Sequence, residues 1–233
     1  MSSRPPKFAA LASISVVTFT YVIAVIQRSS LGVAALEASQ RFDVNAATLS
    51  ALAVFQLMTY TLMQVPAGII LDRFGTKKAI VTGTVIMFAG QLLVALVPVF
   101  IVAVIGRIMV GFGDAFIFIS LVRVVNAWFK GKTASRTQQI VANTGQLGQV
   151  FSSLPFHFVL TQLGWTPAFA MISSLSLAAV IAVLTLLIEP KYPSSPKSIS
   201  EAFATLRENL RHPATRMGFW THFSLQSTGS SFI

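Results

Sequence analysis

The sequence predicts an all-α membrane protein built as a six-helix transmembrane bundle, followed by the start of a seventh helix. Of its 233 residues, 54 % are hydrophobic and only 10 % are charged, whereas soluble domains carry roughly 25 % charged residues. The hydrophobic residues gather in six runs, and each run approaches or exceeds the length of about 20 residues that crosses a bilayer. Backbone groups inside lipid need hydrogen-bond partners within their own segment, so runs of this length are expected to be helices.

The six predicted spans follow one another with short turns between them. They lie at about 8–36, 47–71, 79–100, 101–129, 138–160 and 166–188. Pro98 marks the turn between the third and fourth spans, and a Gly164-Trp165 turn separates the fifth from the sixth. The first run is longer than a bilayer requires and contains Gln27 and Arg28. The predicted bundle therefore comprises residues 1–188.

The composition changes after the sixth span. Residues 189–213 are rich in Pro and Ser and are predicted to form a linker. Within it, apolar residues recur at helical spacing over 199–210, which predicts a short amphipathic helix that lies on the membrane or only separates the bundle from the next span. Residues 214–233 are predicted to begin a seventh helix that stops before it crosses. The chain is thus expected to be the first half of a larger protein, although a complete 233-residue product is the alternative.

Lysine and arginine predict the orientation of the bundle. With a cytoplasmic amino terminus, thirteen basic residues fall in cytoplasmic segments and only Arg41 falls outside. The thirteen are Arg4, Lys7, Arg73, Lys77, Lys78, Lys130, Lys132, Arg136, Lys191, Lys197, Arg207, Arg211 and Arg216. This bias predicts a multi-pass protein of the plasma membrane with both ends of the bundle in the cytoplasm. Short basic clusters between apolar runs also argue against nucleic acid as a partner, despite the net charge of +10.

A cluster of charged residues follows the second span and predicts a tight turn there. The stretch is Gly68-Ile-Ile-Leu-Asp72-Arg73-Phe-Gly75-Thr-Lys77-Lys78. Gly68 permits close approach of another helix, and Gly75 permits a backbone conformation that a side chain would penalise. The pattern G-x-x-x-D-R-x-G-x-K-K resembles the loop signature between the second and third helices of the major facilitator superfamily.

Two further segments strengthen this resemblance, which covers nearly the whole chain. The fourth span contains Gly106-Arg107-Ile-Met-Val-Gly111-Phe-Gly113-Asp114-Ala115. This is similar to the family pattern R-x-x-Q-G-x-G-A-A, with Val110 in place of Gln and Asp114 in place of a small residue. Gln27-Arg28-Ser-Ser-Leu resembles the first-helix D-R-x-x-L pattern of members that carry organic anions, with Gln27 in place of the acid.

The resemblance implies the amino-terminal half of a fold in which two six-helix halves alternate access to a central cavity. The first and fourth helices are expected to line the path, while the third and sixth face lipid. Residues 145–151 lack the glycine-proline signature of drug exporters, which lowers the alternative of a drug/proton antiporter.

Four ionisable residues lie inside the predicted spans, at a cost of about 2.5–3.5 kcal/mol each on insertion scales. Arg28 is the first candidate for solute contact, because its planar fork suits carboxylate or phosphate and Tyr21 shares its helical face. The alternative is that Arg28 extends to the membrane interface. Arg107 and Asp114 are about 10 Å apart along one helix, too far for a direct ion pair. Each therefore needs a partner elsewhere.

Asp114 is a candidate for proton coupling, because it is the only carboxylate inside a predicted span. A structural ion pair with an arginine is the competing interpretation. Arg123 falls on the opposite face of the helix, at the membrane depth of Asp72. We expect it to link structurally to the 68–78 loop.

Polar stripes on the second and fifth spans complete the candidate site. They consist of Gln56, Tyr60 and Gln64, and of Gln139, Asn143 and Gln146. Such stripes form interhelical hydrogen bonds or contact a solute. We take Arg107, Gln56, Tyr60 and Asn143, with Arg28 and Tyr21, as the candidate solute-binding residues.

The sequence favours a transporter over an enzyme. Gly111-x-Gly113 lies inside an apolar helix and does not follow a strand, and the three histidines lack metal-ligand spacing. We expect neither a metal nor a cofactor. The expected function is proton-coupled symport of a small anion, with the lipid bilayer and either a missing second half or a second copy as partners. A non-transporting membrane fragment or interaction protein is the alternative of a different class.

Overall fold

The computed structural model describes residues 7–189, 212–213, 215–217 and 220–221. The chain divides into two units, Met1–Pro193 and Ser194–Ile233, and the bundle belongs to the first. The predicted amphipathic helix at 199–210 lies outside the described residues, as does most of the predicted seventh helix. The boundaries proposed for the linker and the seventh helix therefore stay predictions.

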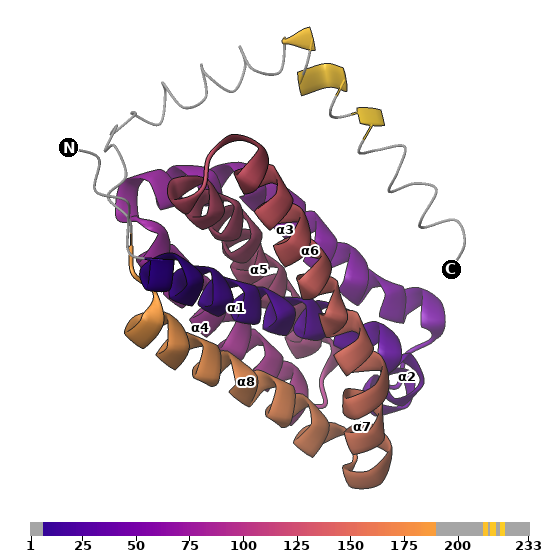
Figure 1. Ribbon diagram of the computed structural model, residues 1–233. Helices are drawn as coiled ribbons and strands as arrows, with labels where there is room; N and C mark the ends of the chain where they lie inside the picture. The colour runs from indigo at the N-terminus through magenta and orange to yellow at the C-terminus, as the bar shows by residue number, and fades with distance from the viewer. Residues whose placement is uncertain (1–6, 190–211, 214, 218–219, 222–233) are drawn as a thin grey trace, which may run out of the picture. The chain divides into compact units, whose positions relative to one another are not determined.

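The first unit is helical throughout its described part, which confirms the predicted fold class (Figure 1). The long helices are α1 (Lys7–Val33), α3 (Ala46–Phe74), α4 (Thr76–Leu96), α5 (Phe100–Trp128), α6 (Gly131–Phe151) and α8 (Trp165–Leu186). All of these except α6 are long and apolar enough to cross a membrane, which gives five candidate spans among the described residues. The protein is thus a multi-pass membrane protein.

The first predicted span ends earlier than its apolar run. The backbone departs from the helix at Ala34, and the short helix α2 (Ala35–Phe42) comes next. Asp43 closes α2 in the left-handed region, at φ 51°. Phe42 is buried and meets Trp165 edge to face, with 5.5 Å between ring centroids. The apolar run extends to residue 36 because Ala35 and Leu36, the exposed first residues of α2, are themselves apolar.

The fifth predicted span is a composite of three segments. After α6 come the π-helix η1 (Ser152–Phe156) and α7 (His157–Leu163). Pro155 lies inside η1 and has no N–H to donate, so the regular helical hydrogen-bond ladder cannot continue through it. A π-helical turn is one of the known ways in which a helix accommodates such an interruption. The predicted span at 138–160 is therefore helical along its whole length, but its geometry changes from α to π around Pro155.

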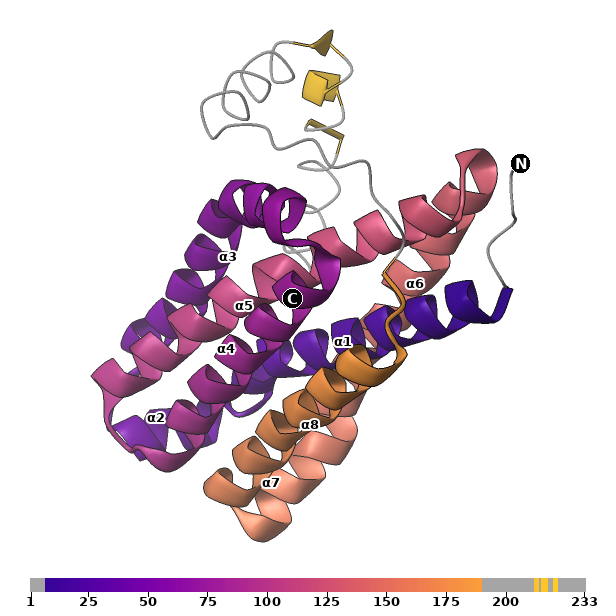
Figure 2. The same cartoon turned by 90° about the vertical axis from the view of Figure 1, so that its left-hand side faces the viewer.

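Glycines let α4 and α5 approach closely. A Cβ atom built on Gly113 would lie 2.2 Å from the carbonyl oxygen of Gly83, and one on Gly106 would lie 2.6 Å from that of Gly90. Small residues at a helix contact are typical of membrane bundles, where close packing drives association. Helix α4 also packs against α8, so that it lies between α5 and α8 (Figure 2).

Helices α1 and α5 are the most buried of the five candidate spans. Helix α5 packs against α1, α3 and α4, and α1 packs against α5, α6 and α8. These two helices also carry the charged residues Arg28, Arg107 and Asp114. These three charged side chains therefore lie where helices pack together, and their partners are protein groups.

Candidate functional site

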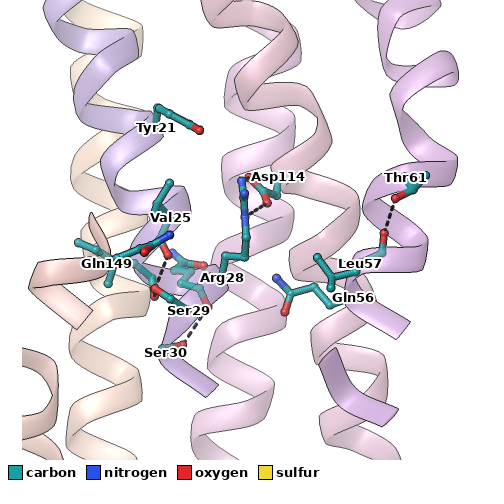
Figure 3. A network of polar contacts seen from close by, with 12 residues as sticks. Tyr21, Val25, Arg28, Ser29, Ser30, Gln56, Leu57, Thr61, Asp114 and Gln149 are labelled. Atoms are coloured by element: carbon teal, nitrogen blue, oxygen red, sulfur yellow. Dashed lines mark hydrogen bonds and ion pairs between the residues drawn. The ribbon is translucent and has the colours of Figure 1, made fainter. Parts of the chain in front are cut away.

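Arg28 and Asp114 form a two-pronged ion pair between α1 and α5. Arg28 Nε donates to Asp114 Oδ2 at 2.8 Å, and Arg28 Nη2 donates to Oδ1 at 3.0 Å. The Arg28 side chain is 30 % exposed, whereas that of Asp114 is 1 % exposed. Figure 3 shows the guanidinium turned toward Asp114, with Tyr21 on the same helix. One face of the charged pair is therefore open while its acidic member is enclosed.

Two tyrosines flank this pair. The guanidinium carbon of Arg28 lies 5.2 Å from the centroid of the Tyr60 ring, a distance suited to a cation–π contact. Tyr21 is buried, its ring fills the space beside Gly145, and its hydroxyl accepts a long hydrogen bond from Gln146 Nε2 at 3.5 Å. The site thus combines one cation, one carboxylate and aromatic surfaces that carry hydroxyl groups.

Arg107 lies in a separate buried layer and holds α1 in place. Its Nη1 donates to the backbone carbonyl of Gln27 at 3.2 Å, and its Nη2 donates to that of Arg28 at 3.0 Å. It also donates to the side-chain oxygens of Gln91, at 3.4 Å, and Gln56. All four acceptors are neutral. A fully buried guanidinium that binds the backbone next to Arg28 fixes the position from which Arg28 reaches Asp114.

Two amides in this layer were not among the predicted site residues. Gln27 Nε2 donates to the backbone carbonyl of Ile172 at 3.3 Å and to the hydroxyl of Ser176, which ties α1 to α8. Gln91 Nε2 donates to Ser30 Oγ at 3.2 Å. Both glutamines are fully buried. The sequence signal for both was an amide inside an apolar run, because buried polar groups almost always have hydrogen-bond partners.

The remaining predicted solute contacts are dispersed. Gln56 is buried and bound to Arg107, so neither side chain can meet a solute in this conformation without exchanging its present partners. Asn143 is exposed on α6. The structure therefore brings Arg28, Asp114, Tyr21 and Tyr60 together and leaves Arg107 and Gln56 one layer behind them.

The 68–78 loop contains the contact expected between Arg123 and Asp72. Arg123 Nη1 donates to Asp72 Oδ1. Gly75 has φ 87°, where side chains are disfavoured, as expected. At Gly68 an added Cβ would meet nothing within 4 Å. Within the described part of the chain, no other helix therefore comes close to Gly68, contrary to expectation. The guanidinium of Arg73 lies 5.6 Å from the ring centroid of Phe74.

Glu189 joins this loop to the end of α8. Its Oε1 accepts hydrogen bonds from the backbone N–H groups of Thr76 and Lys77, the latter at 3.2 Å. Lys77 Nζ in turn donates to the carbonyls of Leu184, at 2.8 Å, and Leu187, at 3.3 Å. A carboxylate at a helix amino terminus satisfies free N–H groups and favours the helix dipole. Glu189, assigned by sequence to the linker, therefore caps α4.

Within the described ranges, no group of three His, Asp or Glu side chains is placed to hold a metal ion.

Comparison with protein families gives a match between the model of the Major Facilitator Superfamily and residues 17–233. Among curated relatives, the chain is 28 % identical over 163 residues to the "Probable L-galactonate transporter" of Escherichia coli K12, covering 70 % of this chain and 36 % of that protein. It is 26 % identical over 189 residues to the "Probable galactarate/D-glucarate transporter GarP" of the same strain, covering 78 % and 42 %.

A third relative is the "Probable sulfoacetate transporter SauU" of Cupriavidus necator, which is 24 % identical over 164 residues, with 70 % and 38 % covered. Among solved structures, the peptide transporter POT (E310Q mutant) in complex with alafosfalin superposes with a TM-score of 0.68 at 13 % identity, covering 92 % of this chain and 46 % of that one. This likeness shows the fold alone. The chain spans less than half the length of each of these proteins.

Proposed function

Because the chain belongs to the major facilitator superfamily, we propose that it supplies the amino-terminal helices of a secondary transporter for a small anionic solute. In this proposal the solute binds Arg28, and Asp114 is the internal group with which it competes. The transporter lies in the plasma membrane with its amino terminus in the cytoplasm. The second set of helices comes from another part of the same protein or from a second copy of this chain.

The observation that carries the proposal is the two-pronged contact between Arg28 and Asp114. A guanidinium fork binds one carboxylate through two parallel hydrogen bonds, and a solute carboxylate or sulfonate presents the same pair of oxygens. Arg28 is the partly exposed member, so an entering anion reaches the fork from its open side. The solute can therefore replace Asp114 as the partner of Arg28.

Exchange of partners also supplies a route to proton coupling. Once Arg28 turns to the solute, the buried Asp114 carboxylate loses its counter-charge, and an unpaired charge in a nonpolar interior is strongly disfavoured. Uptake of a proton by Asp114 removes that charge and releases the fork to the solute. Loss of the proton restores the Arg28–Asp114 pair and expels the solute anion. Solute and proton thus bind together and leave together, as in a symporter.

The relatives support an anion as the solute class. Their names specify galactonate, galactarate or glucarate, and sulfoacetate, all of which carry at least one acidic group. Tyr60 lies against Arg28, and Tyr21, on the same helix as Arg28, is bonded to Gln146, so that the site offers hydroxyl and amide groups to a hydroxylated solute. We therefore propose a small organic acid with hydrogen-bonding groups near its carboxylate. The opposing alternatives, a drug/proton antiporter and a non-transporting fragment, have no comparable contact in their favour.

Binding measurements on the full 233-residue chain in detergent test this proposal. Galactarate and galactitol have the same carbon skeleton and differ in their two carboxylates, so the expected result is binding of galactarate alone. Arg28→Lys keeps a positive charge but loses the planar fork, and it should weaken binding strongly. Lys132→Gln removes an exposed charge far along the sequence and should leave binding unchanged. Equal binding of the acid and the polyol, or full binding by Arg28→Lys, would refute the assignment.

A further inference from the structure

A groove on the outer face of the bundle lies apart from the Arg28 site. It is open between α3 and α4, has α5 behind it, and has a volume of about 350 Å³. Ile70 and Phe74 come from α3, Phe112 and Phe116 come from α5, and α4 contributes Lys78 and Thr82. The two α5 rings lie against each other, 5.6 Å apart at their centroids. The groove is therefore apolar over most of its length, with one cation among its lining residues.

Lys78 lies where the membrane core meets the headgroup region. Helix α4 has 21 residues, which gives a length of about 31 Å, close to the roughly 30 Å of a bilayer hydrocarbon core. Lys78 is the third residue of α4. The charged end of the groove is thus at the membrane surface, and the apolar part extends toward the membrane interior.

The two neighbouring lysines differ in their partners. Lys77 Nζ binds the last carbonyls of α8, and the amino terminus of α4 is capped by Glu189. Lys78 is exposed, and no hydrogen bond or ion pair joins it to another residue in the described part of the chain. Of these two lysines, Lys78 is therefore the one that remains available to an external anion.

We propose that this groove binds one anionic phospholipid, with an acyl chain between α3 and α4 and the phosphate against Lys78. The apolar lining fits the chain, but bulk lipid is equally apolar, so contact with the chain alone gives no preference for one lipid over another. Selectivity must come from charge at the surface end. A basic residue near an anionic headgroup is worth about fivefold in binding, the equivalent of about 1 kcal/mol.

Native mass spectrometry of the full chain, equilibrated with phosphatidylglycerol or phosphatidylcholine at matched ratios, tests the proposal. Wild type should bind one phosphatidylglycerol about fivefold more tightly than phosphatidylcholine. Lys78→Gln should bring the two lipids to equal affinity, whereas Lys132→Gln, an equal loss of charge in the first turn of α6, should keep the preference. An equal effect of both variants would show that the lipid preference depends on the net charge of the protein and not on the position of Lys78, and would refute the proposed site.

A second pair of variants tests the apolar part. Thr82→Trp places bulk in the groove and should reduce binding of both lipids severalfold, while Val85→Trp lies on the same helix outside the lining residues and should not. Unchanged lipid binding by Thr82→Trp would refute the location. A dimer whose population falls only in Thr82→Trp would assign the groove to a second copy of the chain and overturn the lipid as its occupant.

Discussion

Replacing Asp114 by Asn should strengthen anion binding and remove its dependence on pH. The change deletes the negative charge that holds both prongs of the Arg28 fork, at 2.8 and 3.0 Å, and keeps the size of the side chain. The amide oxygen can still accept one of the two hydrogen bonds. The side chain at position 114 of the variant therefore competes with the solute for Arg28 with about one charge-assisted hydrogen bond less than in wild type.

The size of this effect depends on the exposure of the two partners. A hydrogen bond to a charged group contributes about 1.5–3 kcal/mol when buried. Arg28 is 30 % exposed, so solvent screening reduces this to about 1–2 kcal/mol. A free-energy change of that size corresponds to a factor of about 5–30 in an equilibrium constant. We therefore expect galactarate to bind Asp114→Asn about 5–30-fold more tightly than wild type at neutral pH.

Isothermal titration of the purified chain with galactarate between pH 5 and pH 8 measures both parts of this prediction. In wild type, binding should strengthen as pH falls, because a proton on Asp114 removes the competitor of the solute. In Asp114→Asn it should stay at the strong level throughout. Thr61 is exposed on α3 and bonds only within its own helix, so Thr61→Ala serves as a control that keeps the wild-type profile. Weaker binding by Asp114→Asn, or a pH dependence equal to that of wild type, would refute partner exchange.

Three stability predictions concern the packing and the caps, each measured as thermal inactivation in detergent. Arg107→Gln should destabilise the bundle by about 1–3 kcal/mol, because it leaves buried neutral acceptors on three helices without their donor. Gly113→Ala should cost about 1–3 kcal/mol by overpacking against α4, while Gly32→Ala, where an added Cβ meets nothing within 4 Å, should be neutral or stabilising by up to about 1 kcal/mol. Glu189→Gln should lower the stability of the bundle by about 0.5–2 kcal/mol, because it weakens the hydrogen bonds from the first two N–H groups of α4. Equal stability of the variant and wild type would show that this cap contributes nothing.

Most of the fold could be predicted because lipid imposes a simple requirement on the chain. Apolar runs of sufficient length must be helices, and the short turns between consecutive runs predict that these helices pack as a bundle. The ends of the runs were less certain, since apolar residues also occur in surface helices such as α2. The break at Pro155 could be suspected from the missing N–H, but its π-helical form depends on local packing of η1 that no spacing encodes.

The candidate site could be predicted only as a set of charged residues, each of which is energetically unfavourable inside a membrane span. Charge inside an apolar run is sufficient to identify Arg28, Arg107 and Asp114. Their pairing depends on the rotation and depth of α1 against α5, which are set by side-chain packing, so sequence left open whether Asp114 meets an arginine. Gln27 and Gln91 gave a weaker signal because an uncharged amide is much less costly in a membrane than a charge.

The two arginines inside the bundle differ in the groups that they bind, and the roles proposed for them rest on this difference. Arg107 binds only neutral acceptors, two of them backbone carbonyls, and none of these changes charge between pH 5 and pH 8. Arg28 binds a carboxylate, whose charge a proton can remove. We propose that a change of protonation at Asp114 releases Arg28 while Arg107 continues to hold the backbone of α1. In the proposed mechanism the Arg28–Asp114 contact breaks and re-forms while Arg107 keeps the backbone of α1 in place. Solute and proton therefore exchange without a change in the position of α1.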